Sequence, residues 1–276
     1  MLQQNKIWRY NNMYGIDISN HQRNIDLTAG KYDFAIIKAT EGVSFKDPSF
    51  EKFAVQLTGL NKLVGCYHFA RPDLHGTISE MKKEADWFIS VVRKAGLLNK
   101  AILVLDWETE PMDREDLLNA FILRVENQTG ITPFIYGSRY KLNSWKNWWA
   151  INHCPIWMAV WPSLSRPYVG VEPGFTNPDK TVNWSIWQYT SKGLYPNYNG
   201  NIDLDYCELT AEEWKKLAGM KTEPVEVPEV ITKDMQWAID NGIFTGYANG
   251  KYDPKAPLTR EQAATILKRF KQKFIG

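Results

Sequence analysis

The sequence predicts an α/β fold: an irregular (β/α)5(β)3 barrel followed by a small, mainly helical C-terminal module. Three observations predict this arrangement. Short apolar runs rich in β-branched and aromatic residues recur about eight times before residue 207. Amphipathic stretches separate the early runs, as in βα units, whereas the later runs are joined mainly by loops. Beyond residue 220, a polar segment that contains proline precedes a different pattern.

The predicted strands are mostly continuous apolar runs, the pattern of parallel strands that are buried on both faces. They are Tyr14–Ser19, Phe34–Thr40, Leu63–Phe69, Ala101–Glu108, Pro133–Gly137, Ile156–Trp161, Trp184–Thr190 and Ile202–Cys207. Eight parallel strands are typical of a closed barrel, in which the first strand lies beside the last. Closure therefore predicts that Asp17 and Asp203 lie close together.

Helices are predicted between the early strands and after the last one. They are Asp47–Leu60, Thr77–Ala95, Asp113–Thr129, Ser138–Trp149 and Ala211–Gly219. The first is expected to begin at a capping Asp47 with Pro48 as its first helical residue, and the second has the capping-box pattern TISE at Thr77. The stretch Pro162–Thr181 is rich in proline and glycine and is predicted to be a loop.

The chain is predicted to consist of a barrel, a linker and a small module. Residues 1–220 form the predicted catalytic barrel, and residues 221–229, which include KTEPVEVP, form the linker. Residues 230–276 form the module, with helices expected over Lys233–Asn241 and Thr259–Lys273.

Composition and charge exclude several classes of function. A net charge of +2 gives no electrostatic argument for nucleic-acid binding, and no stretch approaches the ~20 apolar residues of a membrane span. The first residues lack the apolar segment of a secretory signal peptide. The odd, scattered set Cys66, Cys154 and Cys207 predicts free buried thiols made in a reducing compartment. The four histidines show no metal-ligand spacing, so we expect no metal and no cofactor.

Carboxylates and aromatic residues follow the predicted strands where the strands end. In LVLDWETE, an apolar run ends at Asp106 and Glu108, whose i, i+2 spacing places both side chains on one side of the strand. In a parallel barrel the carboxyl ends of the strands carry the active site. Asp17 and Asp203 would add two more acids, and crowded carboxyl groups raise each other's pKa. Acid pairs flanked by aromatic residues are typical of glycoside hydrolysis.

Seven motifs, in family order over about Met13–Gly219, resemble glycoside hydrolase family 25, the Chalaropsis-type lysozymes. They are GIDISNHQ (Gly15–Gln22), FAIIKATEG (Phe34–Gly42), YHFARP (Tyr67–Pro72), LVLDWE (Leu103–Glu108), IWMAVW (Ile156–Trp161), WQYT (Trp187–Thr190) and GNIDLDYC (Gly200–Cys207). The resemblance implies hydrolysis of the β-1,4 bond between N-acetylmuramic acid and N-acetylglucosamine in peptidoglycan glycan strands, and the irregular barrel.

The resemblance also implies roles for the residues of these motifs. Glu108 resembles the family's general acid/base, and Asp106 the carboxylate that stabilises an oxocarbenium-like centre or orients the substrate's 2-acetamido group. Asp17 and Asp203 resemble two further acids of the site, whereas we interpret Asp205 as structural. The expected substrate-binding residues are Tyr67, Tyr136, Trp157, Trp187, Gln188 and Glu41. We expect Glu41 either to contact substrate or to pair with Lys38.

The C-terminal stretch Ile231–Phe270 resembles one S-layer homology repeat. Such repeats bind secondary cell-wall polysaccharides, and the motif LTRE (Leu258–Glu261) makes Arg260 the expected ligand of an anionic sugar substituent. The family usually works with three repeats, so pairing between chains into a homodimer is a further expectation.

The sequence thus predicts a cell-wall muramidase of the phage endolysin type, held in the host cytoplasm until lysis and then acting on the wall. A bacterial autolysin, a chitinase-like glycosidase and a non-catalytic wall-binding protein remain alternatives. The longer acidic motif of family 18 chitinases is absent, because Leu103, Val104 and Leu105 precede Asp106. A dead barrel would have lost an acid, and all four are present.

Overall fold

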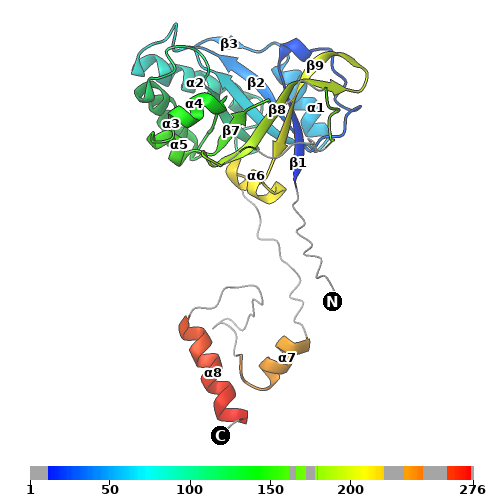
Figure 1. Ribbon diagram of the computed structural model, residues 1–276, viewed down its shortest axis with the longest axis vertical. Coiled ribbons are helices and arrows are strands. Elements are labelled where there is room, and N and C mark those ends of the chain that lie inside the picture. The colour runs from blue at the N-terminus through cyan, green and yellow to red at the C-terminus, as the bar shows by residue number, and fades with distance from the viewer. Residues whose placement is uncertain are drawn as a thin grey trace. The chain divides into compact units, whose positions relative to one another are not determined.

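Strand β1 (Met13–Ile18) pairs with β2 (Phe34–Glu41) on one side and with β9 (Tyr198–Cys207) on the other, and this closes a barrel. The computed structural model describes residues 12–161, 166–171, 178, 180–220, 233–244 and 260–274 (Figure 1). The chain divides into two compact units, Met1–Lys221 and Thr222–Gly276. The barrel belongs to the first unit, and the predicted fold class is confirmed.

Around the barrel the strands follow the order β1, β9, β8, β7, β6, β5, β4, β2. The strands not yet given bounds are β4 (Leu63–Phe69), β5 (Ala101–Asp106), β6 (Phe134–Ser138), β7 (Ile156–Ala159) and β8 (Trp184–Tyr195), and the two-residue strand β3 (Phe45–Lys46) adds to the edge of β2. Neighbours from β1 through β2 and β4 to β8 are parallel. Strand β9 is antiparallel to both of its neighbours, so the prediction of eight parallel strands was wrong for the last one.

A tight hairpin explains the reversed strand. Strands β8 and β9 are joined at residues 196 and 197, where Asn197 has a φ of 58°, a conformation that asparagine tolerates. Both strands are longer than predicted and extend past the barrel. There the Tyr195 hydroxyl accepts a hydrogen bond from Gly30 N (3.0 Å) and donates one to the Asp26 carbonyl (3.1 Å). The hairpin tip is therefore anchored to the β1–β2 connection.

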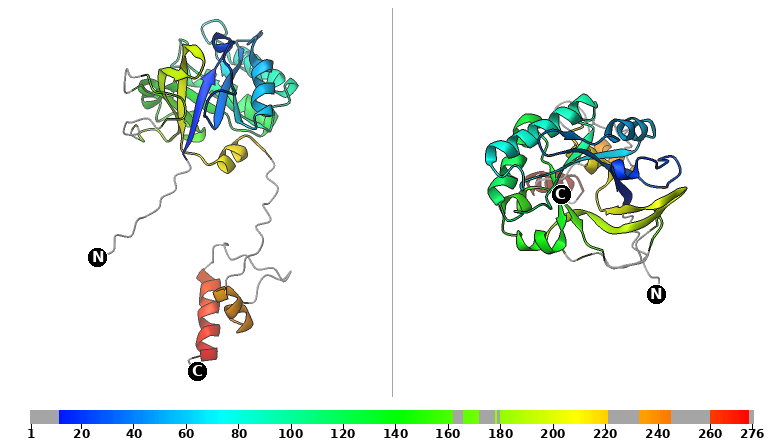
Figure 2. Two further views of the ribbon diagram at one scale, coloured as in Figure 1. Left: turned by 90° about the vertical axis from the view of Figure 1, so that its right-hand side faces the viewer. Right: turned by 90° about the horizontal axis from the view of Figure 1, so that it is seen from above.

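The helices of the first unit lie on the outside of the barrel, and the β8–β9 hairpin forms the side that they leave uncovered (Figure 2). They are the 3-10 helix η1 (Asn20–Gln22), α1 (Phe50–Gly59), α2 (Ile78–Lys94), α3 (Glu115–Thr129), α4 (Arg139–Ser144), α5 (Trp149–His153) and α6 (Ala211–Leu217). The predicted helix Ser138–Trp149 is thus two short helices. The predicted loop Pro162–Thr181 lies mostly outside the described residues.

The two predicted helix starts had different outcomes. Thr77 caps α2 as expected and accepts a hydrogen bond from Glu80 N at 3.3 Å. The prediction for Asp47 was wrong, because α1 begins later, after Ser49. The Asp47 carboxylate instead accepts from Ser49 N at 2.8 Å and from Asn20 N at 2.9 Å, and so connects α1 to η1.

Alternation along each strand separates two apolar regions. On β5, Ile102 and Val104 face the barrel interior, whereas Leu103 and Leu105 pack in the layer between barrel and helices. At the lower end of the interior, Gly15 leaves room for the Phe34 ring, which would lie 2.2 Å from a Cβ atom there. Helix α6 covers this end: the Trp214 ring lies 4.8 Å from that of Phe34. The opposite end of the barrel, where the carboxyl ends of the parallel strands lie, is not covered by α6.

A buried polar network lies between β4 and α2. His68, which is fully buried, contacts Thr40 Oγ1 through Nδ1 and Glu84 Oε2 through Nε2, both at 2.8 Å. The other oxygen of Glu84 contacts His75 Nδ1 at 2.6 Å, and Oε2 also accepts from Arg71 N at 3.2 Å. Burial lowers the pKa of His68, which favours a neutral imidazole. Glu84 therefore links α2 to the loop that follows β4.

The remaining predictions about the described residues concern thiols, spans and the second unit. Cys66, Cys154 and Cys207 are buried and free, as predicted. No helix in the described part of the chain is long and apolar enough to cross a membrane. The second unit contains α7 (Lys233–Asp240) and α8 (Arg260–Phe274), close to the predicted helices, and the Trp237 and Phe274 rings stack at 5.7 Å. The predicted linker 221–229 lies outside the described residues.

Candidate active site

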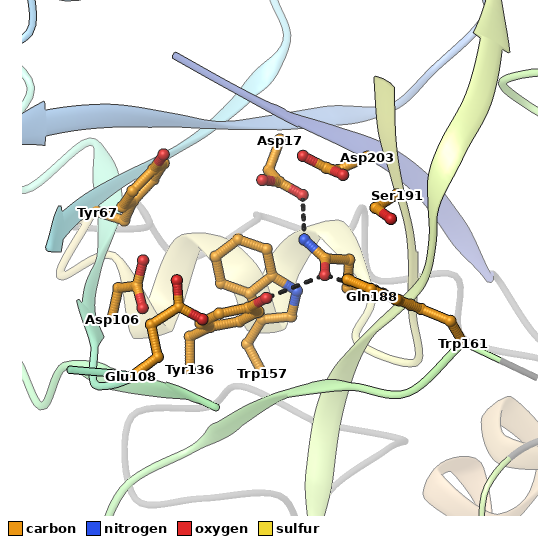
Figure 3. Close-up of a pocket in the computed structure, with 10 residues that line it drawn as sticks. All are labelled: Asp17, Tyr67, Asp106, Glu108, Tyr136, Trp157, Trp161, Gln188, Ser191 and Asp203. Carbon is orange, nitrogen blue, oxygen red and sulfur yellow. Dashed lines mark hydrogen bonds between the residues drawn. The ribbon is translucent and has the colours of Figure 1, made fainter. Parts of the chain in front are cut away.

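A cavity of about 250 Å³ opens at the carboxyl ends of the parallel strands (Figure 3). Ten residues line it: Asp17, Tyr67, Asp106, Glu108, Tyr136, Trp157, Trp161, Gln188, Ser191 and Asp203. Acids and aromatic residues make up most of the lining. The cavity is therefore polar at its walls and has flat apolar surfaces on which a sugar ring could lie.

Period-two alternation explains why these side chains meet. On β5, Asp106 is the third interior position after Ile102 and Val104, and Glu108 follows just beyond the strand. On β1 and β9, Asp17 and Asp203 are direct partners in the strand register. The other acids of the cavity lie near the carboxyl ends of their strands, whereas Asp203 lies nearer the amino end of the predicted strand Ile202–Cys207. It still reaches the cavity because β9 runs in the opposite direction.

Asp17 and Asp203 lie on one side of the Trp157 ring (Figure 3). The side-chain amide of Gln188 donates to Asp17 Oδ2 at 2.8 Å. Burial is the largest cause that raises the pKa of Asp17, followed by the charges of Asp203 and Asp205. The pKa of Asp203 rises to about 6, again through burial first and then through the charge of Glu108. This side of the cavity therefore favours protonated carboxyl groups.

Asp106 and Glu108 form the other acidic group. Burial raises the pKa of Asp106, the charge of Glu108 raises it further, and Asp106 Oδ1 is buried with no hydrogen-bond partner in the described part of the chain. Glu108 reaches solvent at the cavity mouth, yet partial loss of solvation raises its pKa as well. The charge of Lys38 lowers both pKa values and so opposes these effects. A raised pKa favours the protonated form, from which an acid of such a pair can donate its proton.

Aromatic side chains form the floor and one wall of the cavity. The Trp157 ring is buried and lies 4.4 Å from the Tyr136 ring and 6.4 Å from the Tyr67 ring, centroid to centroid. Tyr136 also donates from its hydroxyl to Gln188 Oε1 at 3.0 Å. Trp161 is 55% exposed and donates from its indole to the same oxygen at 3.2 Å. Gln188 thus joins the aromatic wall to Asp17.

The structure brings together most of the residues predicted for the site. Asp17, Tyr67, Asp106, Glu108, Tyr136, Trp157, Gln188 and Asp203 all line the cavity. Trp187 does not, because it alternates with Gln188 and points outward, where its indole donates to the Val160 carbonyl at 2.8 Å. Glu41 also lies outside the lining and pairs with Lys38 at 2.8 Å and with Arg71 at 2.7 Å. Arg260 is the first residue of α8, but its side chain lies outside the described part of the structure.

Two lining residues, Trp161 and Ser191, were not assigned to substrate binding from the sequence. Trp161 ends the motif IWMAVW, so its position after a strand was a usable signal. Ser191 had no such signal, because the pairing of β8 with β9 shifts register between Gln188 and Thr190, and simple alternation fails beyond that point.

The comparisons with known proteins agree with this geometry. Residues 16–198 match Glycosyl hydrolases family 25, and residues 227–264 match the S-layer homology domain. The chain is 40% identical over 214 residues to an N,O-diacetylmuramidase of Chalaropsis sp, an alignment that covers 68% of this chain and 95% of the relative. A bacterial lysozyme from Streptomyces coelicolor has a similar structure, with a TM-score of 0.58, 27% identity and coverage of 75% of this chain and 97% of that one.

A family 25 glycosyl hydrolase from Bacillus anthracis is similar to the same extent, with a TM-score of 0.57, 27% identity and coverage of 77% of this chain and 95% of that chain. The family match covers more than half of the sequence and includes most of the strands that carry the cavity. The chain therefore belongs to glycosyl hydrolase family 25.

Proposed function

We propose that the protein is an N-acetylmuramidase that cleaves the β-1,4 bond between N-acetylmuramic acid and N-acetylglucosamine in peptidoglycan. The observation that carries this proposal is the convergence of Asp106 and Glu108 on one aromatic-floored cavity of a family 25 barrel. A relative named N,O-diacetylmuramidase and a structural neighbour named lysozyme support the bond specificity.

Glu108 acts as the general acid in this proposal. Its raised pKa keeps a proton available for the glycosidic oxygen, and its position at the cavity mouth admits the leaving sugar. Departure of that sugar leaves positive charge on the anomeric carbon, which Asp106 faces from deeper in the cavity. After proton donation, the Glu108 carboxylate can take a proton from the incoming water.

The other predicted substrate-binding residues act either in the cavity or behind it. Tyr67, Tyr136, Trp157 and Gln188 would contact the sugar directly, since all four line the cavity. Trp187 supports the wall by holding the Val160 carbonyl next to Trp161. Glu41 holds Lys38, whose charge acts on the acid pair.

Digestion of purified peptidoglycan tests the proposal. Wild type should release new muramic-acid reducing ends, and Glu108→Gln should release fewer by a factor of about 10³ or more, because the amide cannot donate the required proton. Glu110→Gln is the matched control, since Glu110 lies two residues further along and its side chain is 68% exposed.

Other products would favour the alternatives. Glucosamine reducing ends would assign a different bond, and turnover of chitin in place of peptidoglycan would indicate the chitinase-like alternative. Binding to the wall without release of reducing ends from wild type would support the non-catalytic alternative.

We also propose that residues 1–220 act as the catalytic barrel, 221–229 as a linker and 230–276 as a module that attaches to the cell wall. The S-layer homology match at residues 227–264 supports wall attachment. Within this proposal, Arg260 recognises an anionic secondary wall polysaccharide. The half-exposed aromatic rings of Trp237, Phe270 and Phe274 supply apolar surface for pairing of two chains.

Co-sedimentation with cell walls tests the module. Arg260→Ala should weaken binding by about tenfold or more, and walls stripped of the polysaccharide should bind wild type equally weakly. Lys271→Ala, an exposed change on the same helix, is the matched control. A sedimentation-velocity experiment on the full chain should show a dimer that Phe270→Ser dissociates.

A phage endolysin role is the finer form of this proposal, supported by the combination of a wall hydrolase and a wall-binding match. Expression inside a susceptible host should cause lysis only after the membrane is permeabilised. Lysis of intact cells without permeabilisation would instead indicate an exported autolysin.

A further inference from the structure

Asp205 is a fully buried acid immediately beneath the cavity. It lies two residues after Asp203 on β9, and its register partners are Gly15 on β1 and Gln188 on β8. Because alternate residues share a face, Asp205 faces the barrel interior one layer below Asp203. It does not line the cavity and has no part in the roles proposed above.

One oxygen of Asp205 holds the cavity floor. The indole N–H of Trp157 donates to Asp205 Oδ1 at 2.8 Å, and both residues are buried. A buried indole N–H needs an acceptor, and a carboxylate is a strong one. This bond fixes the plane of the ring on which Tyr136 and Tyr67 pack.

The other oxygen requires a proton nearby. Asp205 Oδ2 is buried, and no donor among the described residues bonds to it. The charges of Asp203 and Asp205 raise the pKa of Asp17, and the charge of Asp203 raises that of Asp205. Burying several uncompensated carboxylates together costs far more than protonating one of them.

Asp17 is the better place for that proton. Asp17 experiences the charges of Asp203, Asp205 and Asp106, whereas Asp205 already accepts a hydrogen bond from Trp157. The Asp17 side chain lowers the pKa of Asp205, which is the direction expected when Asp17 donates a hydrogen bond to it. Asp17 Oδ2 accepts from Gln188, which leaves its other oxygen to carry the proton.

We propose that Asp205 is a positioning residue of the active site: as a buried carboxylate it accepts one hydrogen bond from the Trp157 indole and one from a protonated Asp17. Asp17 then faces the cavity as a neutral carboxylic acid. The arrangement satisfies the orphaned oxygen, places one negative charge on the pair and connects a cavity acid to the aromatic floor. It rests on the proposed function only for its effect on turnover.

The location of the proton is measured without substrate. In protein labelled with ¹³C at aspartate side chains, the Asp17 carboxyl resonance should keep the chemical shift of a protonated acid at pH 7, and the Asp205 resonance that of a carboxylate. Asp17→Asn and Asp205→Asn assign the two signals.

The other groups that interact with Asp205 are Asp203, Tyr189 and Cys207. Burial raises the pKa of Cys207 to about 12 and also raises the pKa of Tyr189, so both side chains stay neutral.

The positioning role is measured on the Trp157 indole ¹H–¹⁵N signal, assigned with Trp157→Phe. The nearly isosteric Asp205→Leu should shift this signal and speed its hydrogen exchange, and should lower kcat/KM about 10- to 100-fold. Asp205→Asn should restore the indole signal, since its amide oxygen can accept the same bond. Asp113→Leu is the matched control, because Asp113 accepts from the Trp145 indole at 2.8 Å outside the cavity.

Distinct results would overturn the proposal. A protonated-acid signal that disappears in Asp205→Asn would place the proton on Asp205 instead of Asp17. Ionised signals for both Asp17 and Asp205 at pH 7 would show that the pair holds no proton. An unchanged Trp157 signal in Asp205→Leu would show that the indole is held by packing alone. If Asp205→Leu does not fold, Asp205→Asn and the ¹³C shifts of wild type still decide the matter. Absence of turnover in wild type would remove the proposed function and leave these spectroscopic results standing.

Discussion

The side-chain amide of Gln188 on β8 donates a 2.8 Å hydrogen bond to Oδ2 of Asp17 on β1, 171 residues earlier in the chain. The oxygen of the same amide accepts from Tyr136 and Trp161 at 3.0 and 3.2 Å. Two donors at the oxygen fix the amide orientation, so that its NH₂ group faces the acid.

Gln188→Glu should therefore reduce both stability and activity. The new carboxylate would keep the bonds from Tyr136 and Trp161, but its second oxygen would face Asp17 without a donor. We expect the free energy of unfolding at pH 7 to fall by about 1–3 kcal/mol and kcat/KM by at least about tenfold. Both losses should be smaller at pH 5, where the pair can take up a proton. Gln128→Glu is the control, since Gln128 donates to Asp86 at 2.7 Å on the surface; equal losses in the two variants would contradict the prediction.

Lys38→Met should move the basic limb of the pH–rate profile to higher pH. The charge of Lys38 lowers the pKa values of Asp106 and Glu108, so its removal raises both, and Glu108 keeps its proton to higher pH. Because the site is partly solvated, the expected shift is below about one pH unit. Initial rates on soluble peptidoglycan fragments between pH 4 and 9 would measure it. Lys46→Met is the control: it removes the ion pair between Lys46 and Glu51 at 2.8 Å and should leave the pH–rate profile unchanged. A shift of the basic limb to lower pH in Lys38→Met would refute the electrostatic role of Lys38.

Asp203→Asn should stabilise the protein at neutral pH at the expense of activity. Folding raises the pKa of Asp203 from 3.8 to about 6, so the folded protein binds this proton more tightly than the unfolded chain. Stability from this group is complete below pH ~4 and is lost as pH rises through about 6. Removing the acid should therefore increase the free energy of unfolding on the order of 1 kcal/mol at pH 7, with little change at pH 3.5. Urea unfolding at both pH values tests this, and a gain of equal size at pH 3.5 would exclude ionisation as the cause.

Glu84→Ala should destabilise the barrel, although Glu84 does not line the cavity. It leaves His68, His75 and the amide of Arg71 without their shared acceptor in a buried network. We expect a loss of about 3–5 kcal/mol in the free energy of unfolding. Glu80→Ala, at a half-buried position in the first turn of the same helix, removes only a hydrogen bond to Thr77 and should cost less than about 1 kcal/mol. Similar chemical-denaturation midpoints for the two variants would show that the network contributes little.

Most of the barrel could be predicted because its strands are buried on both faces. A continuous apolar run such as Ala101–Leu105 is typical of a parallel strand that is buried on both faces, and period two then assigns Asp106 to the interior. The proximity of Asp17 and Asp203 followed from closure alone, and the register pairs them directly. Closure is independent of strand direction, which is why this prediction survived the wrong orientation of β9.

The parts that could not be predicted depend on the hairpin. Tyr198–Asn201 is polar and extends past the barrel, so it lacks the apolar signal of a core strand, and the turn at Asn197 was not recognised. Trp187 and Gln188 are adjacent in one motif and alternate faces, but the motif does not say which faces inward. Ser191 lies beyond a register shift that no sequence pattern marked. The Asp47 cap failed because the carboxylate binds Asn20 N, a long-range partner.

The β8–β9 hairpin carries residues of the active site in one part and a surface turn in another part of the same two strands. Its lower part carries Gln188, which lies opposite Asp205, and Asp203, which pairs with Asp17 on β1. Its tip is tied through Tyr195 to the β1–β2 connection. Changes of length or composition at the tip would thus reshape the neighbouring surface while the acids keep their places. The tip is therefore a segment that engineered variants could exchange while the four acids keep their positions.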